Sequence, residues 1–224
     1  MRTPVNPEEI KARHKKQLVS MRSWLDGKNY WKASEALELV RELEEGTRKD
    51  GVTPKFHHQL SVARLLSTLE PHLLYPEETI TVAFLHDVLE DHGGRYTREY
   101  LEEKFGKRVS DAVWVITKKS NGMVKSYELY YDELAKCPIA SMVKCADRNH
   151  NVQTMLGVFT AEKQVKYITE VETHYYPMIR LARRSFKKQY PAYENLKILL
   201  RCQCRLIEAA LEASGYYDDE KDNG

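Results

Sequence analysis

The sequence predicts an all-α fold that forms a single domain. Along nearly every regular segment, apolar residues recur at intervals of three and four, which places them on one face of a helix. Glycine and proline turn signals separate these segments, and no strong domain boundary is visible. With 224 residues, of which 42% are apolar, the chain is long enough for one substantial core or two small ones. We favour one core.

The expected helices follow one another along the chain. The first covers residues 8–24, with Leu18, Met21 and Leu25 on one side, and the second covers residues 30–45. GTRKDGVTPK is expected to be a loop because its glycines and proline interrupt the pattern. The later helices are expected at VARLLSTL, residues 76–89, TREYLEEKFG, VSDAVWVITKK, SYELYYDELAK, IASMVKCADRNHNVQTM, residues 162–186 and residues 192–213.

Local signals support several of these boundaries. Pro76, followed by two glutamates, suits a first helical turn, Thr97 is an expected N-cap, and Gly106 is an expected stop. VSDAVWVITKK has the β-branched residues of a strand, but its helical neighbours favour a buried helix. The chain is thus divided into an N-terminal helical extension (1–29), the main domain (30–213) and a flexible acidic tail (214–224).

Composition argues against several classes of protein. The formal net charge is +2, so no strong field predicts binding to nucleic acid or to an acidic membrane surface. No apolar run reaches the length of about 18 residues that a membrane span needs. The N-terminal residues MRTPVNPEEIKARHKK lack the apolar core of a secretory signal.

The cysteines indicate a reducing compartment. None of the four, Cys137, Cys145, Cys202 and Cys204, forms a Cys-X-X-Cys pair, so neither a disulfide framework nor a thiolate zinc site is expected. We therefore expect a cytoplasmic protein in which these residues are small core hydrophobes.

The segment FLHDVLEDH, residues 84–92, combines core residues with five ionisable ones. Burying that many ionisable groups is costly unless something pairs with them. On a continuous helix, His86 would lie beside Glu90, and Asp87 beside Asp91. An imidazole and a carboxylate together suit a divalent cation such as Mn, Fe, Zn or Co. The segment is therefore a candidate half of a metal site.

Further ligands are needed to complete such a site. The candidates are the adjacent histidines His57 and His58, and Asp147 in VKCADRNHN. Each has an ordinary explanation, because a His pair at a helix start is usually a cap or solvated, and an Asp in an apolar segment is usually a paired structural carboxylate. The ordered series of His, His-Asp and Asp is harder to attribute to chance.

Three motifs in this order resemble a known family. RKDGVTPKFHHQLSVARLL, FLHDVLED and VKCADRNHNVQTM are similar to the motifs of the HD-domain metal phosphohydrolases, in particular the hydrolase half of the RelA/SpoT enzymes and the small alarmone hydrolases. The resemblance covers roughly residues 30–185 and implies a helical HD-type bundle. One departure is His58–Gln59 where the family usually has His-Pro, which leaves substrate selectivity open.

The resemblance implies roles for individual residues. His58, His86, Asp87 and Asp147 would hold Mn²⁺ or another divalent transition metal, with His57 as the alternative to His58. The implied catalytic pair, which positions or deprotonates the attacking water, is Glu90 and Asp91. The implied substrate-binding residues are Arg48, Lys49, Asn151 and Thr154. His150 would be either a partner of a ligand or a packed core histidine.

The function implied is hydrolysis of the 3′-pyrophosphate of (p)ppGpp to GDP or GTP and pyrophosphate. About 40 residues remain after residue 185, too few for a synthetase domain. Two alternatives stay open: an HD-type phosphohydrolase of another nucleotide (a dNTP or a 2′- or 3′-phosphorylated nucleotide), and a catalytically silent nucleotide-binding protein. The apolar residues Leu199, Leu206 and Leu211 would either pack internally or join two copies in a homo-oligomer.

Overall fold

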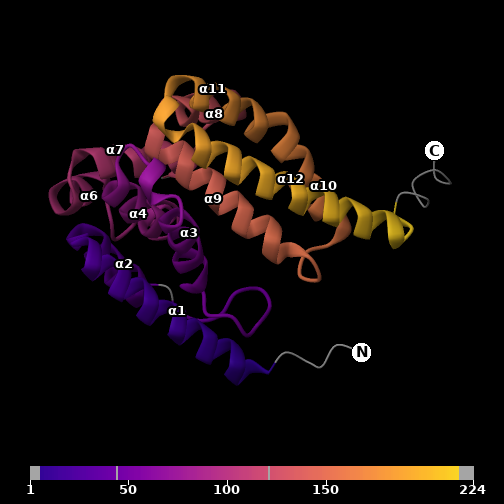
Figure 1. Cartoon of the computed structure of the whole chain (residues 1–224), viewed down its shortest axis with the longest axis horizontal. Coiled ribbons are helices and arrows are strands. Elements are labelled where there is room, and N and C mark those ends of the chain that lie inside the picture. The colour runs from indigo at the N-terminus through magenta and orange to yellow at the C-terminus, as the bar shows by residue number, and fades with distance from the viewer. Residues whose placement is uncertain (1–5, 44, 121, 217–224) are drawn as a thin grey trace.

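A computed structural model describes residues 6–43, 45–120 and 122–216 and confirms the all-α fold (Figure 1). The helices are α1 (Pro7–Lys28), α2 (Trp31–Leu43), α3 (His57–Ser67), α4 (Pro76–Leu85), α5 (Val88–Asp91), α6 (Arg98–Phe105), α7 (Lys107–Ile116), α8 (Tyr127–Lys136), α9 (Pro138–Met155), α10 (Ala161–Glu170), α11 (Tyr176–Ser185) and α12 (Tyr190–Ala213). Short 3₁₀ turns at Glu70–His72 and Lys187–Gln189, a π-helical turn at Val171–Tyr175 and the strands β1 (Lys119–Ser120) and β2 (Met123–Val124) complete the described elements.

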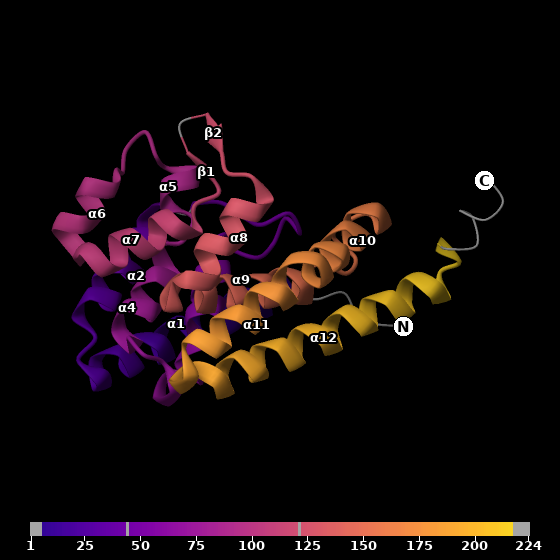
Figure 2. The same ribbon diagram turned by 90° about the horizontal axis from the view of Figure 1, so that it is seen from above.

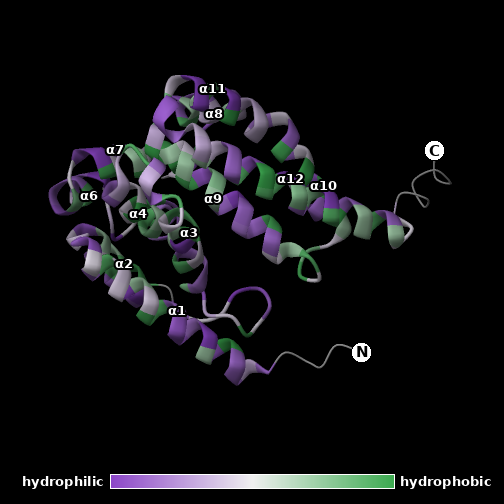
Figure 3. Cartoon of the chain, in the orientation of Figure 1, coloured by the Kyte–Doolittle hydropathy of each residue, from purple (hydrophilic) through white to green (hydrophobic). Residues whose placement is uncertain are grey.

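Two central helices organise the core. Helix α4 packs against α2, α3, α7 and α9, and every residue from Thr79 to Leu85 is buried, as expected for a segment that is apolar all round. Helix α9 packs in turn against α3, α4, α8 and α12. The hydrophobic colouring of α4 contrasts with the mainly hydrophilic α1 at the surface (Figure 3). Residues near the ends of these two central helices can therefore meet inside the molecule.

The terminal helices frame this core. Helix α1 packs against α2 and α3, and its Met21 and Leu25 are buried in the shared core. Seen from above, α10 and the C-terminal half of α12 project beyond the rest of the molecule (Figure 2). The predicted acidic tail lies largely outside the described residues, since residues 217–224 are not described.

Several predicted boundaries are confirmed. The Thr97 side chain accepts a hydrogen bond from the backbone N–H of Tyr100 and caps α6, and Gly106, with φ at 91°, ends that helix. VSDAVWVITKK is helical through Ile116, as predicted, and its last lysine begins the β1–β2 hairpin instead.

Two predicted helices are interrupted. The helix expected over residues 76–89 ends at Leu85, and a turn at His86 and Asp87 precedes α5. The helix expected over residues 162–186 contains the π-helical turn before Pro177. Proline has no N–H to donate to the preceding turn, which explains why the helix widens there.

The cysteines are all free, as expected, but their burial differs from the prediction. Cys145 and Cys204 are buried and Cys137 is half-buried, whereas Cys202 is exposed on α12. The expectation that Cys202 is a core residue is therefore wrong, because it lies on the solvent side of its helix. Among the described residues, no helix is long and apolar enough to cross a membrane.

Candidate metal centre

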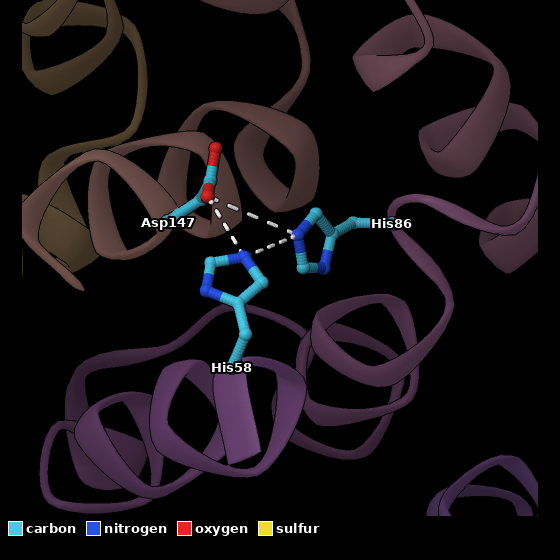
Figure 4. Close-up of side chains that lie close together, drawn as sticks. All are labelled: His58, His86 and Asp147. Atoms are coloured by element: carbon cyan, nitrogen blue, oxygen red, sulfur yellow. Dashed lines mark hydrogen bonds and ion pairs between the residues drawn. The ribbon is translucent and has the colours of Figure 1, made fainter. Parts of the chain in front are cut away.

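Three of the four predicted ligands, His58, His86 and Asp147, converge where α3, α9 and the turn after α4 meet (Figure 4), and Asp87 lies beside them. His58 Nε2 lies 3.1 Å from Asp147 Oδ1 and 3.2 Å from His86 Nε2. His86 Nε2 lies 3.0 Å from Asp87 Oδ2. The side chains of His58, His86 and Asp147 are buried, while that of Asp87 is 32% exposed. The cluster thus has three enclosed donors and one donor at its open side.

The break after α4 produces this convergence. On a continuous helix, adjacent residues point about 100° apart. In the turn, Asp87 adopts φ −99° and ψ −7°, and its carbonyl accepts bonds from the N–H groups of Glu90 and Asp91. The helix restarts one residue later, so the side chains of both His86 and Asp87 reach the same point. Because of this turn, His86 and Glu90 do not lie on one face of a continuous helix, contrary to the prediction from the sequence.

Hydrogen bonds set the orientation of both imidazoles. His86 Nδ1 lies 2.9 Å from the carbonyl oxygen of Ala83 and must donate to it. His58 Nδ1 lies 2.9 Å from His150 Nδ1. Burial lowers the pKa of His150 to about 2, so its ring is neutral and its Nδ1 can accept a hydrogen bond from the N–H of His58 Nδ1. His58 Nε2 then directs a lone pair at the centre of the cluster, and a bound cation would replace the proton that the neighbouring carboxylates hold on His86 Nε2, so both rings can present the form of histidine that binds a metal.

The carboxylates create a strongly negative centre. Burial lowers the pKa of His86, but Asp87 and Asp147 outweigh this effect and raise it to about 9. Asp147 stays ionised despite its burial, because Lys144 and His58 hold its pKa well below the usual value. Its Oδ2 accepts a hydrogen bond from Lys144 Nζ at 3.0 Å, which leaves Oδ1 directed at the histidines. A compact positive charge is favoured at the centre, so this donor set fits a divalent cation.

A cavity of about 620 Å³ opens onto the cluster. Its walls bring together three metal-site residues, all four predicted substrate-binding residues and one predicted catalytic residue, namely His58, Asp87, Asp147, Arg48, Lys49, Asn151, Thr154 and Asp91. This volume is in the range of small-molecule sites.

The loop before α3 supports the cationic side of the cavity. Its backbone closes on itself through the N–H of Arg48, which donates to the carbonyl of Thr53 at 2.7 Å. The Asp50 side chain accepts bonds from the N–H groups of Val52 and Thr53. Gly51, with φ at 72°, provides the left-handed position that this turn needs. The loop therefore holds Arg48 and Lys49 at the cavity without any helix of its own.

Asn151 and Thr154 follow Asp147 on α9 and line the cavity with it. Asn151 Nδ2 donates to Asp147 Oδ1 at 2.6 Å, and the Thr154 hydroxyl donates to the carbonyl of His150 at 2.9 Å. Both side chains are thus occupied by groups of their own helix in this structure. A ligand would have to compete with these bonds or add to them.

The predicted catalytic carboxylates lie in different surroundings. Asp91 lines the cavity. Glu90 is not among the described residues that line it, and its Oε1 accepts hydrogen bonds from the backbone N–H groups of Lys118 and Lys119. Glu90 therefore connects α5 to strand β1 in this structure.

His57 points away from the cluster that includes His58. Its Nδ1 lies 2.9 Å from His14 Nδ1 on α1, and its Nε2 lies 3.4 Å from the Ser61 hydroxyl. Among the described residues, the group that could hold a metal is completed by His58 and does not include His57.

Several cavity residues have no role in the sequence-based prediction. Lys163 and Tyr167, four residues apart on α10, line the cavity together with Phe159. The Nζ atoms of Lys49 and Lys163 lie 5.1 Å and 3.9 Å from the centre of the Phe159 ring. The spacing of Lys163 and Tyr167 indicates a shared helix face. Only the packing of α10 shows that this face meets the cavity.

Comparison with known proteins places the chain among longer relatives. It is 36% identical over 193 residues to a guanosine-3′,5′-bis(diphosphate) 3′-pyrophosphohydrolase of Aquifex aeolicus, an alignment covering 79% of this chain and 27% of that protein. It is 28% identical over 181 residues to the protein of the same name from Haemophilus influenzae, covering 72% of this chain and 26% of that protein. The bifunctional (p)ppGpp synthase/hydrolase SpoT of Escherichia coli is 28% identical over 152 residues, or 64% of this chain and 21% of that protein. The chain thus spans about a quarter of the length of these relatives.

The profile of the HD domain family matches residues 36–185. This range contains all four residues of the metal cluster and the cationic loop beside it. The resemblance of the three sequence motifs to HD-domain proteins is thereby confirmed. The chain belongs to the HD domain family.

Proposed function

We propose that the chain hydrolyses the 3′-pyrophosphate of (p)ppGpp, releasing pyrophosphate and GDP or GTP, with Mn²⁺ as the metal. The observation that carries this proposal is the convergence of His58, His86, Asp87 and Asp147 at the base of a cavity whose wall contains Arg48 and Lys49. The names of the longer relatives support the choice of substrate. We place this activity in the cytoplasm, with a nucleotide rather than a nucleic acid as the partner.

The proposed reaction needs a nucleophile and a counterion for the phosphates. A divalent cation held by His58, His86, Asp87 and Asp147 would supply the Lewis acidity that makes water a better nucleophile and a phosphoryl group a better electrophile. Water adds to the phosphorus next to the 3′-oxygen, the bond between them breaks, and the 3′-oxygen leaves with a proton as the ribose hydroxyl. Asp91, which lines the cavity, is proposed to orient this water and accept its proton.

Glu90 is the second proposed catalytic carboxylate. Because its Oε1 accepts bonds from the backbone N–H groups of Lys118 and Lys119, its proposed role is to fix α5, and with it Asp91, against the hairpin. Movement of the hairpin would then move Asp91 and change the rate of hydrolysis.

The cavity beside the cluster would receive the nucleoside. Arg48 and Lys49 are proposed to bind the phosphates or stack on the base, and Asn151 and Thr154 to bind the nucleotide through their polar groups. The Phe159 and Tyr167 rings also line this cavity, and aromatic rings suit a planar base.

Product analysis tests the proposal directly. The purified chain with Mn²⁺ should release pyrophosphate from (p)ppGpp, whereas dNTPs and 2′- or 3′-phosphorylated nucleotides should turn over much more slowly.

His58→Ala and Asp87→Ala should each abolish metal-dependent turnover, and His57→Ala, a matched change at the neighbouring residue, should retain it. Rapid turnover of another nucleotide without (p)ppGpp hydrolysis would reject the substrate. Metal binding without turnover of any nucleotide would favour the silent binding protein.

A further inference from the structure

Helix α12 has an inner face and an outer face that differ sharply in burial. The inner face packs on the core through Tyr193, Leu196, Leu200, Cys204, Ile207 and Leu211, all of which are buried. The outer face is defined by eight residues that share a sector of about 100° on a helix with 3.6 residues per turn. They are Pro191, Asn195, Ile198, Leu199, Cys202, Leu206, Ala209 and Ala213, all of them exposed.

The outer face of α12 contains no charged residue along the whole helix. Ile198 is 59% exposed and Leu206 is 72% exposed. Single exposed apolar residues are common, but a continuous uncharged stripe along one helix indicates a contact surface. Helix α12 runs along one edge of the molecule (Figure 2). Of the three leucines considered in the sequence, Leu211 packs internally, whereas Leu199 and Leu206 belong to the stripe.

The charges beside the stripe indicate what it binds. Lys197, Arg201 and Arg205 come first along the helix, and Glu208 and Glu212 follow. Within the described part of the chain, none of these five residues forms an ion pair. The flank is therefore basic in its first part and acidic in its last part, and the matching surface is the same helix running in the opposite direction.

We propose that two copies of this chain associate through the outer faces of their α12 helices, packed antiparallel about a two-fold axis near Cys204. This register places Arg201 near Glu208 of the partner subunit. A parallel arrangement would instead turn the two charged flanks to opposite sides of the pair and align like ends of the helix dipoles. A contact made by one helix from each copy lies at the lower end of stable interface sizes, so we expect a concentration-dependent dimer.

Sedimentation velocity of the full chain tests the association. The wild-type chain should shift from monomer to dimer with increasing concentration, and Leu206→Glu should weaken the association by at least about tenfold, because it places a charge in the apolar contact. Leu129→Glu changes a leucine that is 51% exposed on α8 and is the matched control that should leave association unchanged. A monomer at all concentrations, or a dimer that tolerates Leu206→Glu, would overturn the proposal.

Charge exchange tests the register. Arg201→Glu and Glu208→Arg should each weaken the dimer, and the double variant should restore it, because the two residues exchange roles across the axis. Loss of association in the double variant as well would contradict this register.

Cross-linking tests the direction of the helices. In the antiparallel register, Cys202 lies opposite Leu206 of the partner subunit, so L206C should form disulfide-linked dimers on oxidation, seen on a non-reducing gel. L206C combined with C202S should remain unlinked. A parallel pair would place position 206 opposite its own copy, and linkage of the double variant would exclude the antiparallel arrangement.

Discussion

At the scale of single residues, the geometry of the candidate metal cluster depends on His150, which is not one of the predicted ligands. His58, His86, Asp87 and Asp147 converge as the motif order suggests. The role of His150 could not be chosen from the sequence, because it depends on how the rings of α3 and α9 face each other. Its 2.9 Å contact with His58 now indicates that it orients a ligand.

His150→Leu should weaken Mn²⁺ binding by about 10–100-fold, the usual effect of losing a group that orients a metal ligand. Leucine fills similar space but cannot accept a hydrogen bond from the N–H of His58 Nδ1. The His58 ring can then turn its Nε2 away from the centre. Isothermal titration calorimetry measures the change, and His150→Gln, which keeps an acceptor, is the control that should retain more affinity. Equal affinity in wild type and His150→Leu would show that packing alone orients His58.

At the scale of helices and strands, the helical segments were predictable from the sequence, and the interruptions within them were not. The apolar pattern continues across His86 and Asp87, so periodicity alone predicts one helix there. The turn is stabilised by the contacts of both side chains with residues on α3 and α9, which are distant in sequence. The β1–β2 hairpin was also missed, because each of its strands has only two residues.

Glu90→Ala should release the hairpin from α5. The backbone N–H groups of Lys118 and Lys119 lose their shared acceptor, so both should exchange with solvent deuterium faster, by an amount measurable by NMR. Glu90→Gln keeps an acceptor oxygen and should preserve most of the protection. Glu103→Ala removes an exposed glutamate from α6 and should leave these two amides unchanged. Unaltered protection in Glu90→Ala would mean that the strand pairing alone holds the hairpin.

Glu70 joins the α1–α2 connection to the turn before α4. Its carboxylate accepts hydrogen bonds from the Tyr30 hydroxyl at 2.8 Å and from Lys28 at 3.2 Å. The bond from Tyr30, with the help of Lys28, lowers the pKa of Glu70 below its usual value. A lowered pKa stabilises the folded state above the unfolded-state pKa of about 4.3, and this contribution is lost as the pH falls through the folded-state value.

Tyr30→Phe should therefore raise the pKa of Glu70 towards its ordinary value and reduce the loss of stability on acidification. An NMR titration of the Glu70 carboxyl measures the first effect, and urea unfolding at neutral and acidic pH measures the second. Tyr127→Phe, at an exposed tyrosine of α8, is the matched control. A Glu70 titration that is the same in wild type and Tyr30→Phe would assign the lowered pKa to Lys28 instead.

At the scale of the whole molecule, the metal centre is also a junction of the core. Its proposed ligands come from α3, the turn after α4, and α9, which pack on one another at the centre of the fold. In the absence of a cation, two carboxylates and two imidazoles are held together at some electrostatic cost. Metal binding should therefore stabilise the domain as a unit, because the unfolded chain does not present these ligands together.

Mn²⁺ at about 100 times its Kd should raise the free energy of unfolding by about 2.7 kcal/mol. For a domain of this size, that corresponds to an increase in Tm of about 5–10 °C. Differential scanning calorimetry with Mn²⁺ and with excess EDTA measures the shift. Asp87→Asn, at the most exposed ligand, should fold normally yet lose most of the gain, whereas His57→Gln should keep it. An equal Mn²⁺-dependent shift in wild type and Asp87→Asn would place the stabilising metal elsewhere and reject the centre as the link between α3, α4 and α9.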